Sequence, residues 1–249
     1  MLKHHKLISF CFGLLFLIVL QMFANPTPVF RFLLPAFLIY AALITVYNRW
    51  YLKQIQKYNF WILIRPLLLV ASGFGIFLVI PASGLRSLFL LPTALFITGL
   101  EIILGNLAEN ILLNETLIIA FGLFLSLFGA YYYLPATSFE IFYLFGIFLG
   151  SALLTRSFYE LLPKSERSKQ LGAIIIGLFC AELYWVLNFL HFHFSVLSIL
   201  LFNIFYFCLI VNYYHLYHML NYKKIKFHLF LILACSVVVL ISTPWIIVK

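Results

Sequence analysis

The sequence places a carboxylate, Glu182, near the middle of an otherwise apolar stretch, 171–189. A carboxyl group in such a segment is expected to need a hydrogen-bonding partner. Helical rise puts Glu182 about 3 Å and Asn203 about 4 Å outward of their helix centres, so contact between them is expected. Tyr206 shares a face with Asn203. These three residues are predicted to form a midplane site for a substrate or a proton, or else to join two helices.

Arg65 and Glu101 form a second candidate pair. Each lies about 7 Å inward of its helix centre, counting about 1.5 Å of rise per residue. Opposite charges at one depth on adjacent helices predict an intramembrane ion pair. An ion or proton pathway is the alternative.

His191 and His193 stand two residues apart in a short turn. With Glu140 or Glu182 they would make an outer metal site, because imidazole and carboxylate together suit zinc. An HxH sequence in such a turn is more often a solvated pair, so no metal and no other cofactor is predicted.

Two further sets of metal-binding residue types lead to the same expectation. His215, His218 and His228 could hold a metal, but the lysines beside them would repel a cation. The four cysteines each fall inside an apolar run without a CxxC spacing, so we expect buried free thiols.

Composition limits what these residues can do. Of 249 residues, 65% are hydrophobic and 9% charged, whereas soluble domains have about 25% charged residues. Asp is absent, which argues against enzymes that hold Mg²⁺ and phosphate on paired aspartates. The net charge of +9 comes from short clusters between apolar runs. This pattern is typical of membrane topology signals rather than of nucleic-acid binding, so the expected partner is the lipid bilayer.

The chain contains a series of apolar segments long enough to cross about 30 Å of hydrocarbon. They predict an all-α polytopic transmembrane bundle, one membrane domain over residues 1–249, because lipid-exposed backbone must satisfy its own hydrogen bonds. A cleaved signal peptide is the alternative for the first segment, and the fourth and fifth could form one broken span. The nine predicted helices are 7–23, 30–47, 60–80, 88–105, 112–134, 139–155, 171–189, 194–217 and 227–248.

The cationic residues predict the orientation. With the amino terminus in the cytoplasm, twelve Lys and Arg residues fall in inner segments and three in outer ones, while Arg65 lies within a helix. Inner loops are enriched in cations, so the amino terminus is expected inside and the carboxy terminus outside. Glu160 and Glu166 share an inner loop with four cations and are expected to be solvated.

Small residues indicate where helices pack closely. Gly122, Ser126 and Ala130 repeat every four positions on the fifth segment, and Gly146 and Gly150 do so on the sixth. Such faces allow close approach of two helices. A tight hairpin of the fifth and sixth helices is therefore predicted.

Two short runs resemble a known group of sequences. Glu182-Leu183-Tyr184-Trp185 and Asn188-Phe189-Leu190, followed by the aromatic eighth segment, are similar to an uncharacterised family of polytopic membrane proteins from small-genome bacteria, over about forty residues. The resemblance implies no activity. The abundance of Ile, Phe and Lys is typical of an AT-rich bacterial genome, so we expect a multi-pass protein of the plasma (inner) membrane.

Three functions fit these observations. The first is a transporter-like or channel-like bundle for a small solute or ion. The second is a non-catalytic membrane subunit or assembly factor that binds a membrane-protein partner, and a homo-oligomer is also open. The third is an intramembrane enzyme that acts on a lipid, with His191, His193 and Glu182 at its outer face; whether the protein is an enzyme is left open.

Overall fold

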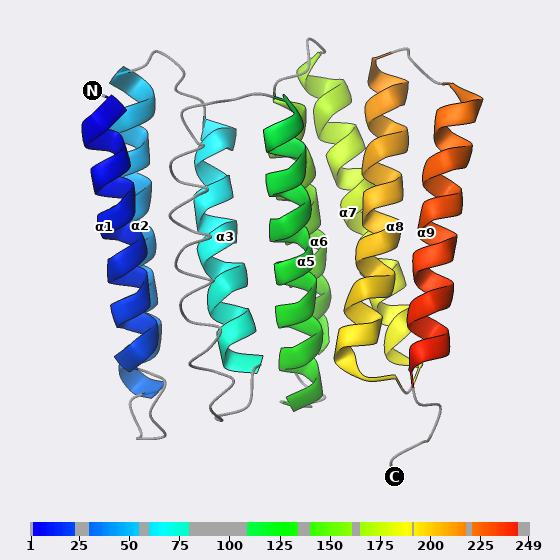
Figure 1. Cartoon of the computed structure of the whole chain (residues 1–249), viewed down its shortest axis with the longest axis horizontal. Coiled ribbons are helices and arrows are strands. Elements are labelled where there is room, and N and C mark those ends of the chain that lie inside the picture. The colour runs from blue at the N-terminus through cyan, green and yellow to red at the C-terminus, as the bar shows by residue number, and fades with distance from the viewer. Residues whose placement is uncertain are drawn as a thin grey trace. The chain divides into compact units, whose positions relative to one another are not determined.

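The computed structural model describes most of the chain as helices. The described ranges are 2–22, 30–54, 60–79, 109–133, 140–160, 165–190, 192–217 and 221–243. Within them lie eight helices and no strands (Figure 1): α1 Leu2–Met22, α2 Phe30–Gln54, α3 Phe60–Val79, α5 Glu109–Tyr133, α6 Glu140–Tyr159, α7 Glu166–Asn188, α8 Phe194–Leu216 and α9 Tyr222–Ser242. The predicted helix 88–105, including Glu101, lies outside the described residues. The predicted all-α fold is thereby confirmed for the residues that the structure describes.

Five of the described helices are long and apolar enough to cross a membrane: Leu112–Tyr133, Glu140–Tyr159, Glu166–Asn188, Phe194–Leu216 and Tyr222–Ser242. Shorter apolar segments, Lys6–Val19 and Leu63–Ile76, lie in α1 and α3. Helices of this length satisfy their backbone groups internally, as the hydrocarbon of a bilayer requires. They indicate a membrane protein.

Several helices begin before their apolar segments because capping residues set their ends. α7 starts at Glu166, where the Ser165 hydroxyl accepts a hydrogen bond from the backbone N–H of Ser168 at 3.4 Å. α9 starts at Tyr222, where Asn221 Oδ1 accepts from the N–H of Lys223 at 2.9 Å. Capping side chains of this kind satisfy N–H groups that have no partner within the helix. Hydropathy identifies the apolar part of each helix and omits these polar first turns.

The chain divides into two compact units, residues 1–115 and residues 116–249. In the first unit α2 contacts both α1 and α3. The Tyr40 hydroxyl donates to the carbonyl oxygen of Phe12 at 3.1 Å, and the Tyr40 and Phe16 rings lie 5.2 Å apart between centroids. Buried aromatic side chains therefore join α1 to α2.

In the second unit the most extensive helix pair is α6 with α7. A Cβ atom added at Gly177 would lie 2.9 Å from the Phe148 carbonyl oxygen and 2.9 Å from the Ala152 Cβ. Gly146 and Gly150 do face α5, toward the side chains of Leu127 and Leu123. The predicted approach of α5 to the glycines of α6 is therefore present at Leu123 and Leu127, but the most extensive pair is α6 with α7, where Gly177 brings the two backbones together.

Helix α8 carries much of the core of the second unit. The Phe124 and Phe205 rings meet edge to face at 5.5 Å, and the Ser198 hydroxyl lies 3.4 Å from the Phe124 carbonyl oxygen. α8 also contacts α7 and α9. α9 has one buried side chain between Tyr222 and Ser242, that of Ile232. α9 is thus a peripheral helix with most of its side chains exposed.

Candidate functional site

Glu182 and Asn203 do not meet in the structure. The Glu182 side chain is exposed on α7, on a surface with Phe179 and Trp185, while Tyr184 of the same helix is buried. Asn203 is buried on α8, and its Nδ2 donates to Ser236 Oγ of α9 at 3.0 Å. The two predicted partners therefore lie on surfaces that face different neighbours. Helix depth alone does not determine which way a side chain points around the helix axis.

Asn203 and Tyr206 instead take part in contacts between α8 and α9. The Tyr206 hydroxyl forms a hydrogen bond with His228 Nδ1 at 2.9 Å, three residues along α8 from the Asn203–Ser236 contact. The predicted polar face of α8 is real, but its partners are Ser236 and His228. His228 and Ser236 are eight residues apart on α9, a little more than two helical turns. This spacing was the signal in the sequence that both residues could face α8.

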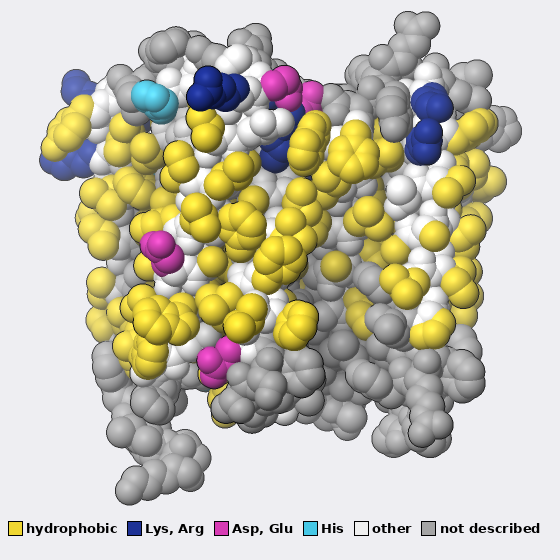
Figure 2. Space-filling view, turned by 180° about the vertical axis from the view of Figure 1, so that it is seen from behind, with side chains coloured by type: hydrophobic (Ala, Val, Ile, Leu, Met, Phe, Trp, Pro, Cys, Tyr) yellow, Lys and Arg dark blue, Asp and Glu magenta, His cyan; other side chains and the backbone are white. Residues whose placement is uncertain are grey.

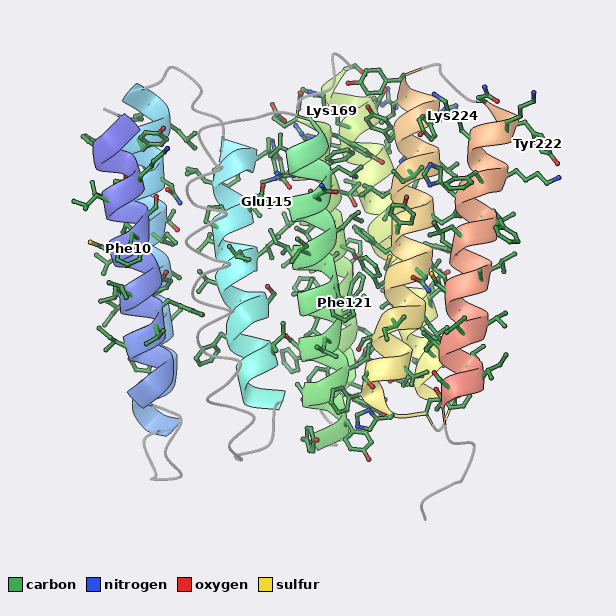
Figure 3. All side chains as sticks on the ribbon, in the orientation of Figure 1. Phe10, Glu115, Phe121, Lys169, Tyr222 and Lys224 are labelled. Atoms are coloured by element: carbon green, nitrogen blue, oxygen red, sulfur yellow. The ribbon has the colours of Figure 1, made fainter. Side chains whose placement is uncertain are left out.

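Arg65 is paired in the structure with Glu115. Arg65 Nη1 donates to Glu115 Oε2 at 2.9 Å, and the side chains are 1% and 2% exposed. Arg65 Nη2 also donates to the Leu112 carbonyl oxygen at 3.3 Å. Glu115 lies on the side of α5 that faces α3 (Figure 3). Glu101, the expected partner, lies outside the described residues.

The sequence contained a signal for the Arg65–Glu115 pair. Arg65 is five residues after the start of α3, and Glu115 is six residues after the start of α5. At a rise of about 1.5 Å per residue, each lies about 7 to 9 Å from the first residue of its helix. In the predicted topology α3 and α5 run in the same direction, so equal distance from the helix start means equal depth. The sequence-based prediction paired Arg65 with Glu101 and did not consider this carboxylate.

The histidines do not assemble a metal site in the described part of the chain, where no three His, Cys, Asp or Glu side chains lie close enough to hold an ion. His191 lies outside the described residues. His193 is the N-cap of α8: its Nδ1 lies 2.7 Å from Ser195 Oγ and accepts from the Ser195 N–H at 3.4 Å. Partial burial lowers the pKa of His193 by desolvation. The neutral ring that this favours is the form that can accept at Nδ1.

A charged cluster lies where α6 ends and α7 begins. Arg156, which is 3% exposed, binds the carboxylates of Glu160 and Glu166. Lys169 Nζ lies 3.3 Å from Glu166 Oε1 and 3.4 Å from the Glu160 carbonyl oxygen. Over this unit, Figure 2 shows Lys, Arg and acidic side chains together at one end and hydrophobic side chains along the middle. Glu166 is 61% exposed, as expected of a solvated loop carboxylate, but Glu160 is 14% exposed.

At the opposite end of α6 and α7 lies a small polar cavity of about 130 Å³. Its lining comes from the end of α5, the start of α6 and the end of α7. Across it the Tyr131 hydroxyl lies 3.4 Å from Glu140 Oε1. The residues whose side chains line it are Tyr131, Glu140, Leu144, Tyr184, Trp185, Asn188 and Phe189. Glu140 was predicted as a possible metal ligand, and its grouping with these aromatic residues, which lie far along the chain, was not predicted.

A larger groove of about 680 Å³ lies between α5, α8 and α9. Apart from the Asn203 amide its lining is apolar, so it offers no charged group to a solute. The residues that line it are Leu117, Ile118, Phe121, Ile199, Phe202, Asn203, Ala234, Cys235, Val238 and Val239. Phe121 points outward from α5 at this groove (Figure 3).

No protein-family model, curated protein or solved structure matches the chain. The resemblance to an uncharacterised family of bacterial membrane proteins therefore stays a prediction.

Proposed function

We propose that the chain is a non-catalytic membrane subunit or assembly factor that holds a partner membrane protein against the Glu182 face of α7. The observation that carries this proposal is the exposure of Glu182 among apolar side chains. Leu178, Trp185 and Val186 beside it are 52%, 53% and 51% exposed. A carboxylate on such a face meets either lipid or another protein.

The energetics favour a protein neighbour. An ionised side chain at the centre of a membrane helix costs about 2.5 to 3.5 kcal/mol on insertion scales, and such residues generally face a protein partner or a water-filled cavity. The opposite face of α7 is already packed, with Ile176, Gly177, Cys180 and Tyr184 buried. A partner helix that presents a hydrogen-bond donor or a basic side chain at the depth of Glu182 would remove this cost.

Orientation and location belong to the same proposal. The protein has nine transmembrane helices in a bacterial plasma membrane, with a cytoplasmic amino terminus and an external carboxy terminus. The support is the distribution of Lys and Arg, including Arg156 and Lys169 at the end of α6 and the start of α7. Labelling of single cysteines introduced at Lys223 and Lys249, in intact cells with a membrane-impermeant reagent, tests it: position 249 should react and position 223 should not. The reverse pattern contradicts the orientation.

The first test of the proposed function is native mass spectrometry of the protein extracted gently from its own membrane. A second polypeptide at fixed stoichiometry is expected. Glu182→Leu should release it, while Glu182→Gln, which keeps hydrogen bonding, should retain part of it. Val238→Leu, at a 65% exposed position on α9, is the matched control and should leave the complex intact. A lone wild-type chain, or a complex indifferent to Glu182→Leu, contradicts the proposal.

A transporter-like or channel-like bundle for a small solute or ion is the second candidate. The polar contacts between α8 and α9, Asn203 with Ser236 and Tyr206 with His228, support it because polar side chains inside a membrane often mark a conducting or binding path. Purified protein in proteoliposomes should then move a solute, and Asn203→Leu or Tyr206→Phe, which remove these contacts, should reduce transport without unfolding the protein. Loss of the fold in both variants would instead assign these contacts a structural role.

A further inference from the structure

The small cavity at the ends of α5, α6 and α7 is built from aromatic rings and hydrogen-bond acceptors. Tyr131, Tyr184, Trp185 and Phe189 supply the rings. The Tyr131 and Tyr184 centroids are 6.4 Å apart, and those of Trp185 and Phe189 are 5.1 Å apart, each pair close to perpendicular. Rings around a common space attract a cation through their faces.

Two acceptors complete the lining. Glu140, exposed at the first residue of α6, brings a carboxylate, and one of its oxygens lies 3.4 Å from the Tyr131 hydroxyl. The Asn188 side-chain oxygen is buried at the last turn of α7. A carboxylate beside aromatic rings favours a positively charged guest, because it adds a full charge to the attraction of the ring faces.

The Tyr184 hydroxyl is a third polar group of the lining. Tyr184 is 1% exposed, and neither its hydroxyl nor the Asn188 oxygen makes a hydrogen bond within the described residues. The two groups lie near one another, but without the geometry of a hydrogen bond. Buried polar groups without partners are destabilising, so a guest that hydrogen-bonds to them would be held there.

The size and the position of the cavity further limit which ligands can bind in it. A volume of about 130 Å³ is well below the roughly 300 to 1,000 Å³ of pockets for drug-sized ligands. It suits a single head group or a small organic ion. Since the lining residues stand at helix ends, the cavity lies where the apolar segments stop, at the level of lipid head groups.

We propose that this cavity binds a primary ammonium group, R–NH₃⁺. Its three N–H donors satisfy Glu140, the Asn188 oxygen and the Tyr184 hydroxyl, and the rings of Tyr131, Trp185 and Phe189 surround the charge and the adjoining carbon. A quaternary ammonium would meet the rings but leave the buried acceptors unsatisfied. The ammonium belongs either to a small free amine or to the ethanolamine head group of a phospholipid. This inference does not depend on the partner protein proposed above.

The test uses the full-length protein in nanodiscs of phosphatidylcholine and phosphatidylglycerol, lipids without a primary amine. Ethylammonium chloride is titrated calorimetrically, with tetramethylammonium chloride, potassium chloride and ethanol as comparison probes. We expect saturable binding of ethylammonium and at least tenfold weaker binding of the other three. Equal binding of tetramethylammonium or potassium, or no binding of ethylammonium, overturns the proposal.

Variants locate the site. Glu140→Gln, at an exposed position, and Tyr184→Phe should each weaken ethylammonium binding about tenfold, which corresponds to about 1.4 kcal/mol. Tyr132→Phe is the matched control, because Tyr132 is 54% exposed and does not line the cavity. Thermal unfolding of each variant separates lost binding from lost fold. If Tyr184→Phe does not fold, Glu140→Gln decides alone, and unchanged affinity in Glu140→Gln overturns the proposal.

A last comparison separates the two sources of the ammonium. In nanodiscs that contain phosphatidylethanolamine, a head-group site is already filled, so the apparent affinity for ethylammonium should fall at least tenfold relative to amine-free discs. A site for free amines keeps its affinity in both. With either source of the ammonium, Glu140→Gln should weaken ethylammonium binding about tenfold in amine-free discs. If phosphatidylethanolamine still lowers the apparent affinity of the Glu140→Gln variant for ethylammonium, the cavity is not the binding site.

Discussion

Arg65 Nη1 and Glu115 Oε2 lie 2.9 Å apart, and both side chains are almost fully buried. Arg65 also binds the Leu112 carbonyl oxygen, so one guanidinium joins α3 to the first turns of α5 twice. Removing one partner of a buried ion pair is destabilising, because the charge that remains in a low-dielectric surrounding carries a large desolvation cost.

Removing one partner of this pair should therefore destabilise the protein strongly. Arg65→Met and Glu115→Leu are each expected to lower the free energy of unfolding by about 3 to 5 kcal/mol, and the double variant by much less than the sum. The measurement is unfolding in mixed micelles at rising SDS fraction. Strictly additive losses would show that the pair is not coupled.

The contact of Gly177 with α6 should be intolerant of a side chain. Gly177→Ala brings a Cβ within 2.9 Å of the Phe148 carbonyl oxygen, so α7 must move away from α6, and a loss of about 1 to 3 kcal/mol is expected. Gly146→Ala is the control, since its Cβ would lie 3.3 Å from the flexible end of Leu127. Thermal unfolding of both in one detergent checks this; a larger loss in Gly146→Ala would contradict it.

The cap of α8 should depend on pH through His193. The pKa of His193 is lowered by desolvation, so the unfolded chain binds its proton more readily than the folded chain does. Stability from this group is then complete above the unfolded pKa of about 6.5 and is lost as the pH falls through that value toward the folded pKa. Protonated Nδ1 can no longer accept from the Ser195 N–H, and a positive charge at a helix N-terminus is unfavourable.

Two variants test the cap. His193→Asn keeps an acceptor and should remove the pH dependence at little cost, whereas His193→Ala should lose about 1 kcal/mol at neutral pH. An NMR titration of the His193 ring gives the folded pKa, and unfolding at pH values on both sides of it gives the stability change. A folded pKa above that of a free histidine would reverse the predicted slope.

The two hydrogen bonds from α8 should govern how firmly α9 is held, because Ile232 is the one buried side chain of that helix. Asn203→Leu with Tyr206→Phe is expected to increase amide hydrogen exchange in α9. Hydrogen bonds between membrane helices average about 0.6 kcal/mol, so the two together predict a roughly five- to tenfold faster exchange. Exchange in α6 is the internal reference and should not change.

Which segments become helices could be predicted from the sequence alone. Eight of the nine predicted apolar segments coincide with described helices, within a few residues at most ends, and 88–105 lies outside the described part. The length of an apolar segment is a local property of the sequence. In an apolar medium the backbone of such a segment must satisfy its own hydrogen bonds, which it does mainly by forming a helix. The early starts of α7 and α9 show the same locality, because Ser165 and Asn221 act on their own first turns.

Which side chains meet depends on the packing of the helices and could not be predicted from the sequence. Depth can be counted along a helix, but rotation about its axis and the identity of its neighbours depend on how all the helices pack. For that reason Glu182 lies exposed, Asn203 contacts Ser236, and Arg65 contacts Glu115. The cavity that contains Glu140 and Tyr184 has the same origin. It joins the ends of helices that are distant in sequence, and packing alone brings those ends together.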